Sequence, residues 1–325
     1  MTRTFLELLL CPSCHQRFLI KQVVGEDTER VLYGTIRCDC SEYPIVDGIL
    51  ITKNDQKTEI IITYVTERKL WKALKLCFDY RPDLNKLLMA TDSNASLGYR
   101  LLGYLICIAT LSKSRVNIPL FRLLSLAGKL HIQVFWTTYL KHRFSATSFW
   151  CFLPFVNFVN GGGKYLMDIG CGMGLSSYIF SKRIDAKHIV CQNLEFAGLY
   201  LAKKYFVPKA NFICSDAGKC FPFLDGSFDF VFSCDALQYV ENKENACREI
   251  CRLLKDDGVS VLAHNHTPHR RDFFSQGSRG DLFEPDSAEA LFSKFNTKVE
   301  LVNEEDIYNS LFPNIVRDDQ RKETT

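Results

Sequence analysis

The residues best suited to chemistry are an acid and three alternating glycines in the middle of the chain. Asp168 ends the short apolar run Tyr165–Met167, and Gly170, Gly172 and Gly174 follow at every second position. A helical pattern comes next, so the stretch reads as a strand, a glycine turn and a helix start, which lets a ligand approach bare backbone. A dinucleotide-binding turn has its third glycine one residue later, where a leucine stands here. The spacing therefore predicts a ligand site but not a pyrophosphate cradle.

Four cysteines near the start of the chain are spaced like metal ligands. Cys11 and Cys14 form a C-x2-C pair, and Cys38 and Cys40 form a C-x-C pair beyond two expected strands. Four thiolates can hold zinc tetrahedrally, and zinc would stabilise a core this small. C-x-C is tighter than usual, so one of its cysteines need not bind, and His15 is an alternative ligand. The other interpretation is four unrelated core cysteines.

Three further residues could act on a substrate. His264 and His266 lie at the end of an expected strand, Val259–His264, and alternate onto one side, so one of them could be a general base. Tyr239, after the preceding strand, is the third candidate catalytic residue. A three-histidine metal site that adds His269 is disfavoured because no carboxylate is near in sequence, and His266 could also be a solvated loop residue.

Parallel strands must bring these residues to one edge of a sheet. Beyond the glycine turn, apolar runs that end in polar residues alternate with helical patterns, which predicts a doubly wound α/β sheet. Strands are expected at Ala186–Asn193, Asn211–Ala217, Phe228–Ser233, Val259–His264 and, late in the chain, Lys298–Val302, with helices at Leu175–Lys182, Leu194–Tyr205 and Glu249–Lys255. In such a fold the ligand lies across the carboxyl ends of the strands.

The order of these motifs resembles the class I S-adenosylmethionine (SAM)-dependent methyltransferases, type 11-like. Their first motif reads acid-x-G-x-G-x-G, as does the stretch from Asp168 to Gly174. The run Phe221–Ser233 is close to the family's LPF-x-D-x-SFD-x-V, and Leu237–Val240 resembles the short helix that follows. The resemblance implies a Rossmann-like methyltransferase sheet with SAM as its cofactor.

The resemblance also implies which residues would bind SAM. They are Asp168, Gly170, Gly172, Gly174, Asn193, Asp216, Ala217 and Cys234, with Asp168 facing the methionine ammonium and Asp216 accepting the adenine amino group. The family usually has an acid for the ribose hydroxyls where this chain has Asn193. An amide lacks that charge, so we expect ribose binding to be weaker or to move to Glu195. An N-P-P-Y-type motif, which would have named the acceptor atom, is absent.

The N-terminal segment has its own resemblance. The run Glu42–Ile49 is similar to the "YPI-x-DGIP" ending of small zinc-ribbon proteins that activate tRNA and ribosome methyltransferases. In that family the ribbon binds and stabilises the methyltransferase. The resemblance implies that both are fused in this chain and that the ribbon is a scaffold.

From Asn94 to Met167 the chain has no acidic residue. It has eight cations there, interleaved with aromatic residues: Arg100, Lys113, Arg115, Arg122, Lys129, Lys141, Arg143 and Lys164. Three interpretations stay open: a helical cap on the sheet with solvated cations, an RNA-binding surface, and a peripheral membrane contact through the apolar, aromatic stretch Phe149–Val159.

Composition narrows the class of protein. The 325 residues are 47% apolar with a net charge of +3, which is enough for a full core and says little about partners. The apolar run Phe5–Leu10 is too short for a signal peptide and contains Glu7, and the best apolar run, Leu101–Ser112, is too short for a membrane span. Fourteen scattered cysteines then favour a reducing compartment. We expect a cytoplasmic protein.

The sequence thus predicts an α/β protein with a Rossmann-like doubly wound sheet, an N-terminal zinc ribbon and a helical insert. The expected units are a ribbon (1–54), a basic and aromatic helical region (55–160), a methyltransferase domain (161–315) and a polar tail (316–325). The leading function is methyl transfer from SAM to oxygen or nitrogen of a small-molecule or lipid-like acceptor. The alternatives are an RNA methyltransferase, with RNA bound through 94–167, and a weakly active or inactive SAM-binding partner protein.

Overall fold

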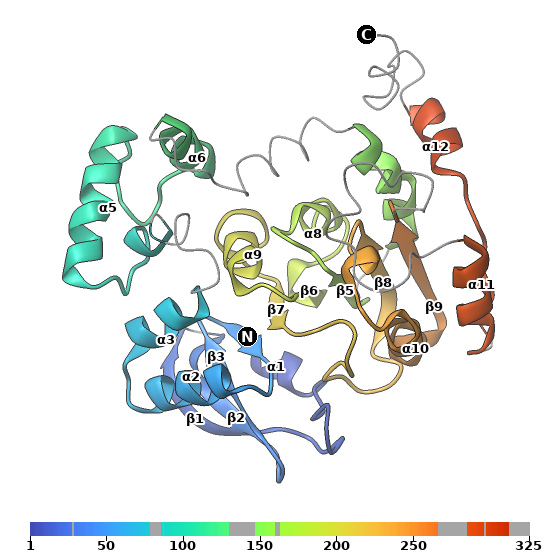
Figure 1. The fold of residues 1–325 in the computed structure, drawn as a ribbon, viewed down its shortest axis with the longest axis horizontal. Coiled ribbons are helices and arrows are strands. Elements are labelled where there is room, and N and C mark those ends of the chain that lie inside the picture. Colours follow the sequence, from blue (N-terminus) through green and yellow to red (C-terminus); the bar gives the residue numbers. More distant parts are fainter. Residues whose placement is uncertain are drawn as a thin grey trace.

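The central element of the fold is one nine-stranded mixed sheet. A computed structural model of the chain describes residues 1–27, 29–78, 86, 88–129, 147–159, 163–265, 285–295 and 297–311. The strands lie in the order β1-β2-β3-β4-β7-β6-β5-β8-β9 (Figure 1). Within the described residues no helix is both long enough and apolar enough to cross a membrane.

The parallel part of the sheet is the predicted doubly wound unit. It comprises β5 (Leu166–Ile169), β6 (Ile189–Asn193), β7 (Asn211–Cys214), β8 (Phe228–Cys234) and β9 (Leu254–Ala263). β5 lies in the middle, and Met167 pairs with Val190 of β6 on one side and Val231 of β8 on the other. The chain moves outward from β5 in both directions, so the crevice at the carboxyl ends of β5, β6 and β8 is where a ligand binds in this class of fold. The predicted fold class is confirmed.

Helices cover both faces of the sheet because side chains along each strand alternate between two cores. Leu166 and Phe232 face a core shared with α2 (Gln56–Thr66), α3 (Leu70–Cys77), α8 (Leu175–Phe180), α9 (Phe196–Leu201) and the 3₁₀ segment η1 (Thr147–Val159). Met167 and Val231 face the second core, shared with α1 (Arg3–Leu6), α10 (Lys243–Leu253) and α11 (Pro285–Ser293). The segment η1 contributes buried Phe152 to the first core, which fits the cap interpretation for this part of the insert.

Two expectations from the sequence were wrong in detail. The expected strand at Lys298–Val302 does not form, and the segment there has no regular secondary structure before α12 (Glu304–Leu311) begins. β9 begins at Leu254 rather than Val259, because Phe228 of β8 already pairs with Leu254 and the acidic turn becomes part of the strand. The predicted tail 316–325 lies outside the described residues.

The N-terminal segment continues the same sheet. β1 (Leu19–Glu26), β2 (Val31–Arg37), β3 (Glu42–Val46) and β4 (Ile49–Ile51) form an antiparallel meander. β4 then pairs in parallel with β7, placing Leu50 beside Ile213. β7 would otherwise be an edge strand with a row of unpaired backbone groups, so the N-terminal meander closes that edge. The sequence did not predict this pairing, and the domain boundaries stay a prediction.

Buried polar contacts tie the insert to the rest. Asp92 accepts a hydrogen bond of 2.7 Å from the Tyr200 hydroxyl in α9. The Lys204 ammonium donates to the hydroxyl of Thr91 at 2.8 Å, and the neighbouring Lys203 forms an ion pair of 2.8 Å with Asp47 between β3 and β4. Burial lowers the pKa of Lys204 to about 8. The end of α9 and the residues after it therefore contact both the insert and the N-terminal meander.

We predict that Phe5→Ala destabilises the whole chain rather than the N-terminal segment alone. The Phe5 ring is buried against Phe223 with centroids 5.9 Å apart, and Phe223 packs edge-on against Phe228 of β8 at 5.0 Å. Truncating a buried phenylalanine costs about 3–5 kcal/mol. Urea unfolding followed by far-UV circular dichroism should show one transition shifted to lower urea.

The matched control is Leu19→Ala, since Leu19 is in the same segment but 66% exposed and should shift the transition little. Two separate transitions, of which only one moves in Phe5→Ala, would contradict a shared core.

Candidate functional site

The glycine turn after β5 has the backbone conformation that its spacing predicted. Gly170, Gly172 and Gly174 have φ of 68°, 55° and 78°, a backbone region that residues other than glycine rarely adopt. A methyl group on Gly170 would overlap the Cβ of Ala236 in the loop after β8, and one on Gly174 would lie 2.8 Å from the Cβ of Ala202. Ala236 and Ala202 therefore pack closely against the turn, and the backbone of the turn lies at the carboxyl end of the central strand.

Asp168 is buried beneath this turn. Its carboxylate accepts hydrogen bonds from the hydroxyls of Ser176, at 2.7 Å, and Ser177, both at the start of α8. Burial raises its pKa to about 6. In the structure the acid joins the end of β5 to α8. Its predicted contact with a methionine ammonium stays a prediction, and the two serines were missed from sequence.

Gln192 is a second residue that sequence reasoning missed. Its buried side chain accepts a hydrogen bond of 3.0 Å from the Gly170 backbone N–H and donates one of 2.7 Å to the Ser215 carbonyl. It thereby holds the glycine turn against the segment after β7. Only its place near the end of an expected strand could have indicated it.

The remaining predicted cofactor residues come to the same edge. Asn193 ends β6 and donates a hydrogen bond of 3.0 Å to the Glu195 carbonyl, while Cys234 ends β8 and is buried. Asp216, just beyond β7, accepts a 2.9 Å hydrogen bond from the Gly218 backbone N–H, with half-buried Ala217 between them. The structure therefore gathers all eight predicted residues at the carboxyl ends of β5 to β8, and their roles stay predictions.

The loops after β8 and β9 have features typical of a binding site. Asp235 and His264 have φ of 53° and 52°, and side-chain-bearing residues in this region cluster at functional sites. Within the described residues, two buried polar atoms near the end of β8 have no hydrogen-bond partner, the Ser233 hydroxyl and the Gln238 side-chain carbonyl. A ligand with polar groups at this edge could satisfy them.

Of the predicted catalytic residues, two are described. His264 lies at the end of β9, where its Nδ1 is 3.2 Å from Oε2 of Glu304 and its backbone N–H donates to the same carboxylate. Tyr239 follows β8 and is 42% exposed. His266 lies outside the described residues. Glu304 was missed because it lies forty positions away in α12, with no motif to mark it.

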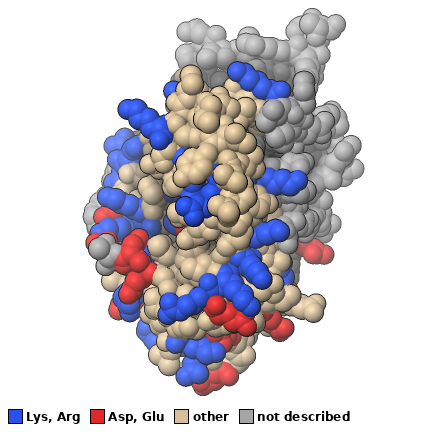
Figure 2. All heavy atoms as spheres, turned by 90° about the vertical axis from the view of Figure 1, so that its left-hand side faces the viewer, with Lys and Arg blue, Asp and Glu red and all other residues tan. Residues whose placement is uncertain are grey.

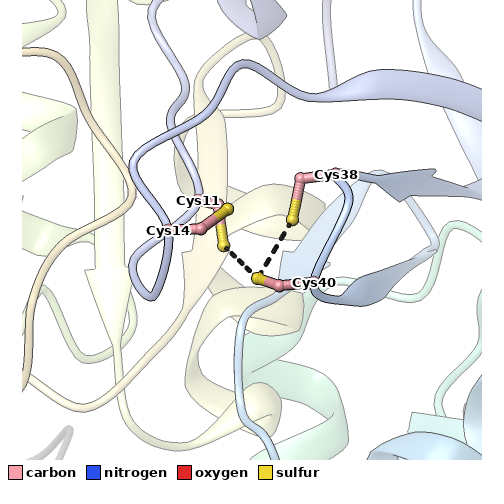
Figure 3. A group of neighbouring side chains, drawn as sticks. All are labelled: Cys11, Cys14, Cys38 and Cys40. Carbon is pink, nitrogen blue, oxygen red and sulfur yellow. Dashed lines mark hydrogen bonds between the residues drawn. The ribbon is translucent and has the colours of Figure 1, made fainter.

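The four N-terminal cysteines gather at one point (Figure 3). Their sulfur atoms all lie within 4.8 Å of one another, and Cys40 Sγ is 3.5 Å from the sulfurs of Cys11 and Cys38. Tetrahedral zinc with bonds of about 2.3 Å holds its sulfur ligands about 3.8 Å apart, so the cluster fits the ion. Both C-x-C cysteines belong to the cluster, and His15 does not.

The part of the chain that is similar to known methyltransferases is the parallel sheet. The family model for the methyltransferase domain matches residues 167–262, from β5 to β9. The chain is 26% identical over 121 residues to ajmaline N-methyltransferase of Rauvolfia serpentina, covering 36% of this chain and 41% of that one. It is 33% identical over 102 residues to a sterol 24-C-methyltransferase of Gibberella zeae, covering 30% and 26%. The chain spans less than half the length of these relatives.

Similar solved structures include the YcgJ protein of Bacillus subtilis. It is 21% identical with a TM-score of 0.38, and the match covers 44% of this chain and 66% of that one. A chain in a complex between the Trm112 methyltransferase activator and a methyltransferase of Haloferax volcanii is 18% identical with a TM-score of 0.39, covering 45% and 67%.

Proposed function

We propose that the chain is a methyltransferase that moves a methyl group from SAM to oxygen or nitrogen of a small-molecule or lipid-like acceptor. The observation that carries the proposal is the glycine turn, left-handed at three glycines and packed under the loop after β8, inside the segment that the methyltransferase family matches. Similar proteins include ajmaline N-methyltransferase, a sterol 24-C-methyltransferase and a malonyl-[acyl-carrier protein] O-methyltransferase. These relatives favour small or lipid-like acceptors.

SAM brings its own activated methyl group, so the protein has mainly to position the reactants. Gly170, Gly172 and Gly174 would let the methionine part lie on the main chain. Asp216 and Ala217 would hold the adenine, and Asn193 would bind the ribose through its amide. The absence of an acid at Asn193 is the one feature that favours the weakly active or inactive alternative.

His264 is the proposed general base. The Glu304 carboxylate contacts its Nδ1, so that carboxylate would fix the orientation of the ring and leave proton uptake to Nε2. Cys151 of η1 lies 3.7 Å from the Glu304 carbonyl, which ties α12 to the segment that covers the sheet. Glu304 would therefore be a positioning residue, and Tyr239 a second candidate on the acceptor side.

The cysteine cluster is proposed as a structural zinc site. Contact with the Ser41 hydroxyl, and then with the other three thiols, lowers the pKa of Cys40 to about 7, whereas burial raises the pKa of Cys38 to about 12, so zinc binding would release protons from the cluster. The cluster joins the knuckle before β1 to the turn between β2 and β3, and four strands, β3, β4, β7 and β6, separate β2 from β5 in the sheet. The ion would thus support the fold and not the reaction.

We predict that Gly170→Ala weakens binding of S-adenosylhomocysteine by more than about tenfold, because the added methyl group collides with Ala236 and forces the turn to move. Isothermal titration calorimetry measures this directly. Gly98→Ala is the matched control, since a methyl group there meets nothing within 4 Å. Equal binding by the two variants would argue against a cofactor on this turn.

We predict that the wild-type protein transfers label from isotopically labelled SAM into the small-molecule or organic fraction of a cell extract. His264→Gln should slow transfer by about 10²–10⁴-fold, the usual contribution of a general base, with unchanged S-adenosylhomocysteine affinity. Glu304→Gln should slow it less, and Glu305→Gln, which alters an exposed neighbour, should leave it unchanged.

Label in an RNase-sensitive fraction would instead support the RNA methyltransferase. Full activity of His264→Gln would remove that residue from the reaction, whereas cofactor binding without any labelled product would support the inactive SAM-binding protein.

We predict one zinc ion per chain by elemental analysis of the purified protein. Cys40→Ser removes one of four ligands and should lower both zinc content and thermal stability, because the ion closes a small core. Cys220→Ser, which changes a half-buried cysteine outside the cluster, is the matched control. Unchanged zinc content in Cys40→Ser would show that the ion binds elsewhere.

A further inference from the structure

The insert presents an apolar surface to solvent along α5 (Leu97–Ala109). Its outward residues are large and apolar at helical spacing, and we name this set the α5 ridge: Leu97, Leu101, Tyr104, Leu105, Ile108 and, just beyond the helix, Leu111. They are strongly exposed, for example Leu97 by 74% and Ile108 by 72%. The spacing of three and four residues puts them on one side of the helix.

The opposite side of α5 is apolar as well. Gly103 and Ile106 are buried, and a methyl group on Gly103 would collide with the Ala90 carbonyl, so this side is closely packed on the protein. An ordinary surface helix has one polar face. A helix that is apolar all round is normally buried or lies in a lipid environment. The α5 ridge therefore needs a cover that the described residues do not supply.

Charge around the α5 ridge indicates what that cover is. Arg100 and Lys113 are exposed at its side and end, and Lys129 is exposed at the end of α6 (Leu120–Lys129). No Asp or Glu occurs from Asn94 to Met167. Figure 2 shows this side of the molecule: the upper part carries tan and blue surface, while the acidic side chains gather in the lower part. Large apolar residues bordered by cations are the pattern of an interfacial helix.

We propose that the α5 ridge is a docking surface for a lipid bilayer that contains anionic headgroups. Leucine and isoleucine would enter the headgroup–acyl boundary, Tyr104 would lie at the interface as aromatic side chains do, and the cations would contact the lipid headgroups. The predicted membrane contact is thereby moved from Phe149–Val159, whose Phe152 and Val156 are buried in the core, to α5.

Two other covers fit the observations less well. A second copy of the chain packed symmetrically on the α5 ridge would bring its Arg100 and Lys113 near the same cations without any acid from this segment to pair with them. RNA binding needs cations and several stacking rings on the surface, whereas the ridge has one ring, Tyr104, among five aliphatic side chains. A bilayer with anionic headgroups can take up the aliphatic side chains and pair with the cations around them.

The test is co-sedimentation of the full chain with sucrose-loaded vesicles, either of phosphatidylcholine alone or of equal parts phosphatidylcholine and phosphatidylglycerol. The wild type should bind the anionic vesicles, and Leu101→Ser with Ile108→Ser should weaken that binding more than about tenfold, since each buried aliphatic side chain contributes strongly to partitioning. Leu19→Ser with Leu301→Ser removes two apolar side chains elsewhere that are also more than half exposed, and this variant should bind like the wild type.

A second double variant tests how much the cations contribute to vesicle binding. Arg100→Gln with Lys113→Gln should weaken binding to anionic vesicles about tenfold or more and leave binding to neutral vesicles unchanged. Circular dichroism of each variant confirms that it folds. The readout needs neither SAM nor an acceptor, so it can fail independently of the proposed methyl transfer.

Three results would overturn the proposal. One is the absence of vesicle binding by the wild type. Another is a concentration-dependent dimer, seen by sedimentation, that the ridge variant abolishes, because then a second copy covers the surface. The last is binding to RNA that weakens with salt and is lost in the ridge variant.

Discussion

The pairing of β4 with β7 is the constraint on which the rest of the structure depends. β7 is buried along its whole length, and Phe212 and Ile213 face opposite cores. A buried edge strand needs a neighbour, because each unpaired backbone group away from water costs about as much as a lost hydrogen bond. Three residues of β4 provide that neighbour. The meander behind them therefore belongs to the same sheet and the same two cores, and the cysteine cluster at the end of β2 belongs to the same sheet as the parallel strands.

Local signals explain what could be predicted from the sequence. The strands β5 to β8, the glycine turn and the cysteine pairs each have a pattern within a few residues, and all were found close to their observed places. The β4–β7 pairing could not be predicted, since Ile49-Leu50-Ile51 is a short apolar run with no mark of its partner. Gln192 and Glu304 were missed for the same reason: their roles come from contacts with Gly170 and His264 that only the folded chain creates.

The site shows how the work of polar residues is divided. Asp168 and Gln192, both buried, bind backbone or hydroxyl groups and so shape the glycine turn. Asp235 and His264 stand in left-handed conformations after neighbouring strands, and Gln238 has a buried carbonyl without a partner among the described residues. Strained backbone and unpaired buried polar atoms cluster at functional sites, where a ligand or a reaction makes use of them. The residues that shape the glycine turn and the residues with strained backbone or an unpaired polar atom therefore lie at the same edge of the sheet.

Two surfaces of this chain would be unfavourable if water covered them. The edge of β7 would leave backbone groups unpaired, and strands from the same chain cover it. The α5 ridge exposes aliphatic side chains, and the described residues do not cover it. Apolar side chains scattered over a surface need no explanation, but five along α5 and a sixth just beyond its end, in a span from Asn94 to Met167 that has cations and no acid, form a continuous patch. A lipid acceptor would reach such a protein at the membrane, so the proposed docking surface and a lipid-like acceptor would serve the same purpose, although each is supported by separate residues.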